Sequence, residues 1–479
     1  MYLGIDIGTS GVKALVIDER DRPVAQATAP LTVSRPRPLW SEQDPEQWWD
    51  AVATALDSLA ADAPRAMAAV RAIGLSGQML GVTLLDAADQ PVRPALLWND
   101  GRATAECAEL EQRFPSFAET VGCRAMPGFP APKLLWLSRH EPQALARTRR
   151  VLLPKDTVRL RLGGEAISDR ADSSATLLMD ARAGNWHDGL LDACGLDRAQ
   201  LPRLVESGEI AGTLRTDLAM RWHLRVATPL VGGAGDNMCA GVGVGAVTAG
   251  AAYVGLGTSG VYFLATDGFV PATRGGMHTH RHAVPGLYCQ NAVVLSAGAA
   301  LAWVAGLLRV PDIEALVAEV EAAALAPSDT PVFTPYLSGE RTPHDDPSLT
   351  ATFSGLTHGV GSLALVQSVM EGVALALADG HDALLASGAR IAEITLTGGG
   401  ARSALWARLI AAAIGLPLRV QVDAQSGPAL GAARLARRGI GGPLIAAAGA
   451  SRTVAVDRPL REQLLAKRSL FHKHLALPR

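Results

Sequence analysis

The sequence lacks several features that define large classes of protein. It has no stretch of 18 or more apolar residues without a charge, so no membrane-spanning helix is expected. Its formal net charge is only −2, which argues against a general affinity for nucleic acids or anionic membranes. The N-terminal stretch Tyr2–Ile7 is too short for a secretory signal and has no charged region or cleavage site. These absences predict a globular cytoplasmic protein with no nucleic-acid or membrane partner.

Cysteine is also scarce. The chain has 5 cysteines in 479 residues, an odd number, and no two of them form a Cys-x-x-Cys pair. A disulfide framework or a zinc site is therefore not expected, and reduced thiols are. These cysteines are Cys107, Cys123, Cys194, Cys239 and Cys289.

What is present is a pattern of strands and helices that occurs twice, which predicts an α/β protein of two similar halves. Asp44 is a plausible N-cap for the first helix, with Pro45 at its first position. We expect domains at 1–240 and 241–479, the second with a C-terminal extension from about residue 440. The expected strands are Tyr2–Ile7, Val12–Asp18, Val24–Thr28, Ala72–Leu75, Val82–Asp86, Gly250–Leu256, Val261–Leu264 and Ile391–Thr397. The expected helices are Pro45–Leu59, Leu295–Leu307, Ile313–Leu325, Leu363–Ala386, Ser403–Ile414 and a last one from about Pro428 to Gly439.

The five residues Gly-Thr-Ser-Gly-Val occur at Gly8–Val12 and again at Gly257–Val261, each between two expected strands. Such a turn points consecutive N–H groups and hydroxyls outward and can bind phosphate, although Gly, Ser and Thr dominate ordinary hairpins too. Two copies in facing halves favour a cleft with two phosphate loops. Asp6 ends the first strand, where a carboxylate can hold Mg²⁺ against phosphates or cap the turn.

Asp236 follows an apolar run and four small residues, Gly232–Gly235, near the junction of the halves. A carboxylate there can accept a proton from a hydroxyl that attacks a phosphoryl group, or act as a helix N-cap. Thr397–Ser403 joins a strand to a helix through three glycines, a setting in which a flat ligand can lie on backbone. The loose G-x-G-x-x-A at Gly241–Ala246 follows a helical pattern and indicates a small-residue helix face rather than a dinucleotide site.

These motifs, taken in order, resemble the signatures of the FGGY carbohydrate kinases, which belong to the actin-like, hexokinase-like ATPases. The matching stretches are Asp6–Ser10, Gly235–Asn237, Gly255–Gly260, Gly398–Ser403 and Gly427–Ala432, joined by Val33–Trp49, Leu97–Arg102, Leu153–Asp156 and Pro335–His344. The resemblance covers nearly the whole chain. It implies two duplicated actin-like (ribonuclease H-like) domains, each a mixed β-sheet with helices, around an interdomain cleft.

The resemblance also implies an activity, namely ATP-dependent phosphorylation of D-xylulose on O5 with Mg²⁺. Asp236 would be the general base, and Asp6 would hold Mg²⁺ through water. The implied sugar contacts are Gln78, Met79, Leu80, Trp98, Asp100, Asp236 and Asn237. The implied ATP contacts are Gly8, Thr9, Ser10, Gly257, Thr258, Ser259, Gly399, Gly400 and Ser403. A homodimer would be ordinary for such an enzyme, although the sequence shows no interface signature.

One position departs from the family, because Leu80 stands where its members usually have histidine. A lost polar contact can cost about 1 kcal/mol or more, so a related ketopentose or pentitol such as ribulose or arabitol is the alternative substrate. A non-sugar actin-like ATPase scaffold is a further alternative, which would need neither Asp236 on its glycine turn nor Gln78. His278, His280 and His282 alternate along an expected strand or loop. Without neighbouring carboxylates we favour a polar segment over a metal site.

Overall fold

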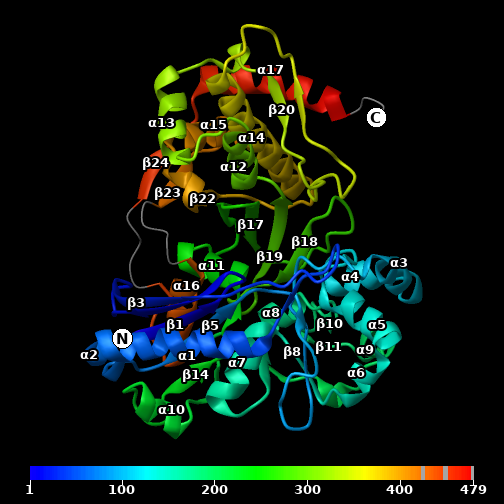
Figure 1. Ribbon diagram of the computed structural model, residues 1–479, viewed down its shortest axis with the longest axis vertical. Coiled ribbons are helices and arrows are strands. Elements are labelled where there is room, and N and C mark those ends of the chain that lie inside the picture. Colours follow the sequence, from blue (N-terminus) through cyan, green and yellow to red (C-terminus); the bar gives the residue numbers. More distant parts are fainter. Residues whose placement is uncertain (422–426, 446–450, 476–479) are drawn as a thin grey trace.

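The computed structural model describes residues 1–421, 427–445 and 451–475, and the side chains through residue 473. Two lobes lie one above the other in Figure 1, the first half of the chain below and most of the second half above. Each lobe is built on a sheet of seven strands with helices packed on its faces. The two duplicated α/β halves expected from the sequence are therefore confirmed.

The lower sheet runs in the order β3-β2-β1-β5-β14-β13, with β15 beside β5. Strands β1, β5 and β14 are parallel to one another, and β2, β3 and β13 are antiparallel to their neighbours. The strands are β1 (Tyr2–Ile7), β2 (Gly11–Ile17), β3 (Pro23–Pro30), β5 (Ile73–Gly77), β13 (Ile210–Thr213), β14 (Pro229–Val231) and β15 (Ala234–Gly235).

The upper sheet repeats this order and these directions as β19-β17-β16-β22-β23-β24, with β18 added beside β19. Identical topology in both halves is the structural mark of duplication. Its strands are β16 (Ala251–Leu256), β17 (Gly260–Thr266), β18 (His278–Arg281), β19 (Tyr288–Val294), β22 (Glu393–Thr397), β23 (Leu418–Gln421) and β24 (Ser451–Val454).

Helices form where apolar residues recur on one face, and they cover the sheets. The first, α1 (Pro45–Asp62), begins as predicted: the Asp44 carboxylate accepts from the Glu46 N–H at 3.0 Å, with Pro45 in the first turn. In the upper lobe α14 (Ser362–Ala386) is long and apolar enough to cross a membrane, but most of it is buried in the protein core. The other upper helices are α12 (Gly298–Leu307), α13 (Ile313–Ala323), α15 (Ala404–Ile414) and α17 (Arg458–Leu475).

A small helical unit, which the sequence patterns did not predict, lies beside the lower sheet (Figure 1). It has its own core, which includes Phe117, Phe129 and Leu134. Its helices are α3 (Thr104–Arg113), α4 (Phe117–Val121), α5 (Pro130–His140), α6 (Pro142–Arg147) and α9 (Asp188–Ala193). Two further helices, α7 (Pro154–Gly163) and α8 (Arg170–Ser174), join it to the sheet, and α2 (Pro64–Ala68) and α10 (Thr216–Arg221) complete the lower helices. Short strands fill the connections: β4 (Glu42–Gln43), β6 (Thr83–Leu85), β7 (Ala95–Leu96), β8 (Arg150–Leu152), β9 (Ile167–Asp169), β10 (Met179–Asp180), β11 (Asn185–Trp186), β12 (Arg203–Val205), β20 (Val332–Thr334) and β21 (Thr352–Ser354).

Two helices cross at the junction of the lobes. An added β-carbon at Gly431 of α16 (Gly427–Gly439) would lie 1.8 Å from the carbonyl oxygen of Cys239 in α11 (Asp236–Val244). The same α16 packs on the lower sheet, where a β-carbon at Gly4 would lie 1.9 Å from the Ala429 carbonyl oxygen. Glycine is required wherever backbones approach this closely. The small-residue helix face expected at Gly241–Ala246 is confirmed, since α11 runs through Val244.

The end of the chain differs from the sequence expectation in one respect. The helix near Pro428 is not the last, because α17 follows it and buries Leu464 and Phe471 in the upper core. Strand β24 pairs with β23 and so occupies the same place in the upper sheet as β13 does in the lower one. The signal was missed because α17 is rich in Arg and Lys, and its apolar residues are spread along the helix.

Candidate active site

The site begins with the direction of the strands. Strands β1, β5 and β15 are parallel, and Asp6 pairs in register with Ser76, which itself pairs with Ala234. Because the carboxyl ends of parallel strands meet at one edge of a sheet, Asp6 and Asp236 come together there. Three segments far apart in the sequence thus deliver their polar residues to one place.

Asp236 is the first residue of α11, with Gly235 at the N-cap position. Its carboxylate accepts from the Asn237 N–H at 2.8 Å. Burial first, and then the nearby Asp6 carboxylate, raise the pKa of Asp236 to about 7. A carboxylate of that pKa is poised to take a proton near neutral pH. Because Gly235 is the N-cap of α11, Asp236 does not act as the N-cap that the sequence offered as an alternative.

Asp6 lies on β1, and burial raises its pKa to about 6 against the lowering effects of Ser76 and Lys13. Among the described residues its buried Oδ1 atom has no hydrogen-bond partner. A buried carboxylate oxygen without a partner is unstable unless something positive lies against it. Asp6 therefore fits a divalent cation or its water shell, since Mg²⁺ prefers carboxylate oxygens and retained waters.

The first glycine turn is held by side chains. The Thr9 hydroxyl donates to the Gln78 amide oxygen at 3.1 Å and accepts from the Trp98 indole N–H at 3.0 Å. The Gln43 amide donates to the Thr9 carbonyl at 2.7 Å. Gln78 also donates to Gln43 at 2.8 Å. These bonds fix the turn Gly8–Ser10 between β1 and β2.

The second turn is held by backbone. The carbonyls of Gly257 and Thr258 accept N–H groups from residues 297–299, where α12 begins, at 2.8–3.0 Å. The third glycine segment lies beside it, since a β-carbon at Gly398 would lie 2.7 Å from the Leu256 carbonyl oxygen. The carboxyl ends of parallel β16 and β22 bring the two together. Gly399 is exposed there, whereas Ser403 caps α15 and donates to Glu321 at 2.7 Å.

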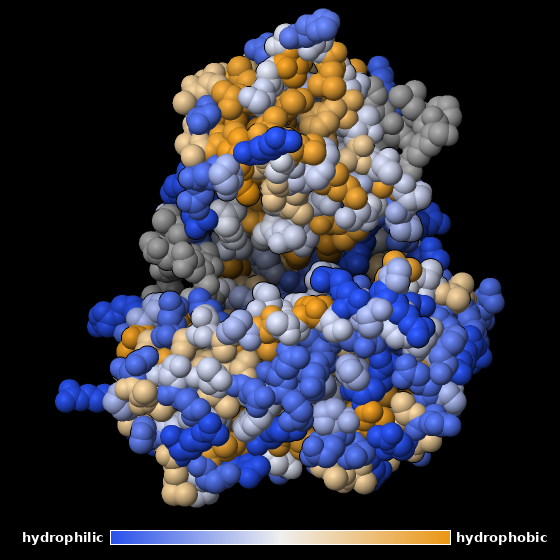
Figure 2. All heavy atoms as spheres, in the orientation of Figure 1, coloured by the Kyte–Doolittle hydropathy of each residue, from blue (hydrophilic) through white to orange (hydrophobic). Residues whose placement is uncertain are grey.

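A cavity of about 190 Å³ joins the two lobes. The molecular surface is hollowed between the lobes in Figure 2. From the lower lobe the cavity is lined by Met79, Leu80, Trp98, Phe129, Asp236 and Asn237, and from the upper lobe by Ser259, Val261, His278, His280, Asn291, Val293 and Arg341. Ser259 of the second turn and Asp236 thus line one space.

Leu80 has an unusual backbone conformation, with φ of 68°. Buried Lys133 of α5 donates to the Leu80 carbonyl at 2.6 Å, and also to the carbonyls of Leu96 at 3.2 Å and Leu97 at 2.9 Å. Three acceptors match the three N–H groups of an ammonium. Lys133 therefore ties the Met79–Leu80 segment to the strand that leads to Trp98. No local sequence pattern indicated this role of Lys133, because the residue lies on a helix of the unpredicted unit.

Two of the sugar contacts implied by the sequence do not reach the cavity. The Asp100 carboxylate is buried and accepts from the Ser41 N–H at 2.7 Å and from Arg102. The Gln78 side chain accepts a hydrogen bond from Thr9 and donates one to Gln43. Both residues hold the loops that carry Trp98 and Thr9, and their contact with the sugar stays a prediction.

The histidines of β18 are buried, as is His282 just after it. His282 bonds the Ala246 carbonyl at 3.0 Å, which is a structural role, whereas His278 and His280 line the cavity. Among the described residues no group of His, Cys, Asp and Glu has the geometry of a metal site. His278 and His280 lie on a strand, as one of the two expected settings had it, and their position at the cavity was not foreseen.

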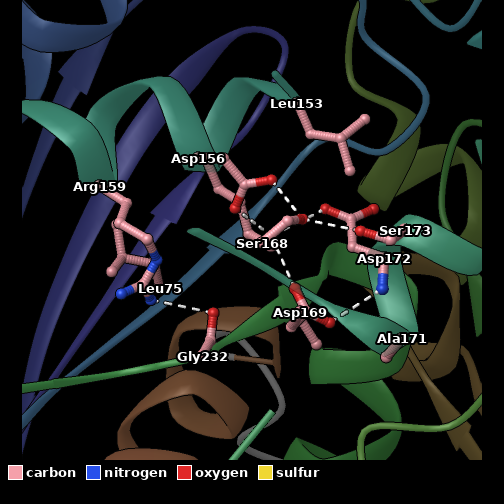
Figure 3. A network of polar contacts seen from close by, with 12 residues as sticks. Leu75, Leu153, Asp156, Arg159, Ser168, Asp169, Ala171, Asp172, Ser173 and Gly232 are labelled. Atoms are coloured by element: carbon pink, nitrogen blue, oxygen red, sulfur yellow. Dashed lines mark hydrogen bonds and ion pairs between the residues drawn. The ribbon is translucent and has the colours of Figure 1, made fainter. Parts of the chain in front are cut away.

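A buried network of charged residues reaches Gly232, which begins the turn before Asp236, and Figure 3 shows Arg159 of this network beside Gly232. Lys155 lies 2.6 Å from Asp156, 2.7 Å from Asp169 and 3.3 Å from Asp172. Arg159 donates to the Gly232 carbonyl at 2.9 Å. A β-carbon at Gly235 would lie 2.8 Å from the Asp172 Oδ1 atom. Together with the Met79 Cγ atom, which would lie 2.5 Å away, Asp172 leaves little space for a side chain just before Asp236.

The comparisons with known proteins agree with this geometry. The chain is 47% identical over 438 residues to the xylulose kinase of Escherichia coli (strain K12), a match that covers 91% of this chain and 90% of that protein. A crystal structure of a xyloylose kinase from Brucella ovis has a TM-score of 0.95 and 44% identity, and the match covers 99% of this chain and 98% of that chain. A xylulose kinase from Rhodospirillum rubrum has a TM-score of 0.91 and 27% identity over 99% and 98% of the two chains.

Two related α/β halves, each with a glycine turn after its first strand and with a cavity between them that Asp236 and Ser259 line, define a class of two-domain phosphotransferases. The N-terminal domain model of the FGGY family of carbohydrate kinases matches residues 1–243, and the C-terminal domain model matches residues 252–440. The chain belongs to the FGGY family of carbohydrate kinases. Its substrates as a member of this class are a sugar and ATP.

Proposed function

We propose that the protein phosphorylates D-xylulose on O5, with ATP as the donor. The observation that carries this proposal is the cavity that both Asp236 and Ser259 of the second glycine turn line. A hydroxyl held at Asp236 and a phosphoryl group held at the turn would meet there. The relatives named xylulose kinase supply the identity of the sugar.

In the proposed mechanism Asp236 accepts the O5 proton as that oxygen attacks the γ-phosphoryl group. The Asn237 N–H holds one carboxylate oxygen and leaves the other for the hydroxyl. Most of the rate enhancement comes from holding the two reactants in line and from excluding water when the lobes close. Asn237 and Met79 orient the sugar, and Trp98 covers it.

The nucleotide is proposed to lie across the two turns. Residues Gly8–Ser10 and Gly257–Ser259 border the phosphates, and Gly399 and Gly400 border the adenosine. Ser403 is a weaker candidate, since its hydroxyl is engaged by Glu321. Asp6 is proposed to hold Mg²⁺ through water, which would supply charge neutralisation at the phosphates.

The test is ADP release with Mg-ATP and a panel of D-xylulose, D-ribulose, L-ribulose, xylitol, D-arabitol and glycerol. We expect a clear preference for D-xylulose and a loss of about 10²–10⁴ in kcat for Asp236→Asn. Preference for another sugar would retain the mechanism but replace the substrate. An ATPase that needs no sugar and survives Asp236→Asn would contradict the proposal and favour the scaffold.

Leu80 favours a second candidate substrate, because it places an apolar side chain at the cavity where family members usually have a histidine. A related ketopentose or pentitol is therefore the alternative, and the same panel decides it. The homodimer, the cytoplasmic location, the absence of nucleic-acid and membrane partners, and the domain division at residue 240 stay predictions. The packing of α16 on the lower sheet means that such a division would not separate the lobes in space.

A further inference from the structure

The upper wall of the cavity is one face of the β18–β19 pair. His278 pairs with Asn291, and His280 pairs with Cys289. Directly paired residues of antiparallel strands share a face, and so do residues two apart along a strand. His278, His280, Asn291 and Val293 therefore form one surface, the β18–β19 wall, and all four line the cavity.

Two atoms of this wall are buried and have no partner. The Asn291 Oδ1 atom and the His280 Nδ1 atom make no hydrogen bond to any of the described residues. Asn291 and His280 are only 3% and 2% exposed. Leaving such groups unpaired costs free energy, so native proteins seldom bury them without a purpose. Burial also lowers the pKa of His280 to about 4, so its ring is neutral near pH 7 and offers one donor and one acceptor.

Two neighbouring side chains, those of His278 and Cys289, have partners. His278 contacts the Met126 sulfur at 3.4 Å and packs edge-on against Phe129. The Asn291 amide nitrogen lies 3.8 Å from the Cys289 sulfur, which leaves its oxygen free to accept. His278 and Cys289 thus hold the wall in place, while His280 and Asn291 line the cavity and each carry a buried atom without a partner among the described residues.

The opposite wall supplies little to a polyol beyond the reacting end. Met79, Leu80 and Phe129 are apolar, and the Trp98 indole N–H already donates a hydrogen bond to Thr9. Asp236 and Asn237 serve the hydroxyl that is phosphorylated. A five-carbon sugar carries further hydroxyls, each of which loses water on entry and needs a partner.

We infer that Asn291 and His280 of the upper lobe bind the non-reacting hydroxyls of the sugar and so determine which polyol is accepted. The inference rests on the proposed function, and it adds residues of the upper lobe to the sugar-binding site. It also couples recognition to closure, because a sugar held by Asp236 below and by Asn291 above bridges both lobes.

The test uses the isosteric variant Asn291→Leu, together with His280→Leu. We expect the KM for D-xylulose to rise at least tenfold in Asn291→Leu, with kcat and the KM for ATP changed less. The Tm without sugar should stay the same or rise, because an unpaired buried amide has been removed. His282→Asn is the matched control, since His282 is buried and follows the same strand but bonds Ala246 outside the cavity. It should lower the Tm without raising the sugar KM.

Deoxy analogues of the sugar, each lacking one hydroxyl at C1, C3 or C4, locate the contact. If Asn291 binds a given hydroxyl, removal of that hydroxyl from the sugar should lower the affinity of the wild-type enzyme. The same removal should not lower the affinity of Asn291→Leu any further. Additive losses for every analogue, or sugar KM values within twofold of wild type in both variants, would overturn the inference. A wild-type preference for another sugar would contradict the proposed function without contradicting the inference about Asn291 and His280. The wall is then tested with that sugar, and if no sugar is phosphorylated both proposals fall.

Discussion

The two halves carry the same five residues in the same turn of the same topology, yet the structure supports the turns differently. Thr9 in the lower turn is bonded by the side chains of Gln78 and Trp98, whereas the upper turn is bonded through its backbone by the start of α12. Two residues before each turn the lower strand has Asp6 and the upper strand has Gly255. Duplication thus preserved the scaffold, whereas single positions such as Asp6 and Gly255 came to differ between the halves.

The largest expected effect concerns the carboxylate of Asp236, which lies with Asp6 at the edge of the lower sheet. The pKa of Asp236 is raised to about 7, so the base is about 1% ionised two units lower. We expect kcat/KM at pH 5 to be about 100-fold below its plateau above pH 8. A profile that is flat from pH 5 to pH 8 would contradict the assignment.

The same group has an opposite effect on stability. Between pH about 4 and about 7 the folded chain holds a proton on Asp236 that the unfolded chain has lost, so the free energy of unfolding falls as pH rises through that window. Asp236→Asn should therefore have a higher Tm than wild type at pH 8, and the difference should vanish near pH 4. Thermal unfolding at both pH values without ligands measures it.

Asp6 gives the next largest effect, because it is the residue that the upper half replaces by glycine. If Asp6 orients the water shell of Mg²⁺, Asp6→Asn should cost about 10–100-fold in activity and raise the Mg²⁺ concentration needed for half-maximal rate. Asp18→Asn, in a surface turn where Asp18 bonds Arg20 and Arg22, is the control. An unchanged magnesium requirement in Asp6→Asn would remove the metal role.

The crossing helices give a smaller effect, on stability. Gly431→Ala places a β-carbon against the Cys239 carbonyl, which cannot move without shifting α11, and should cost about 1–3 kcal/mol. Gly306→Ala in α12 meets nothing within 4 Å and should gain up to about 1 kcal/mol. Denaturant unfolding compares the two. Equal effects would show that the crossing is not tightly packed.

The smallest effect separates the turns themselves. Thr9→Val removes a hydroxyl with two side-chain partners and should cost about 1–2 kcal/mol. Thr258→Val removes an exposed hydroxyl, and only the Thr258 carbonyl is bonded, so its cost should be within about 0.5 kcal/mol. Chemical denaturation of both variants decides it, and a reversed order would refute the distinction.

The sequence by itself determined the duplicated α/β scaffold and the places of Asp6, Asp236 and both glycine turns. It could do so because strand periodicity, glycine turns and caps such as Asp44 are set by neighbours along the chain. Only the tertiary structure showed that Lys133 binds three carbonyls, that Asp100 is turned away from the cavity, and that His280 and Asn291 form its upper wall. These positions depend on segments distant in sequence that meet only when sheets pair and lobes pack, and no local pattern records such a meeting.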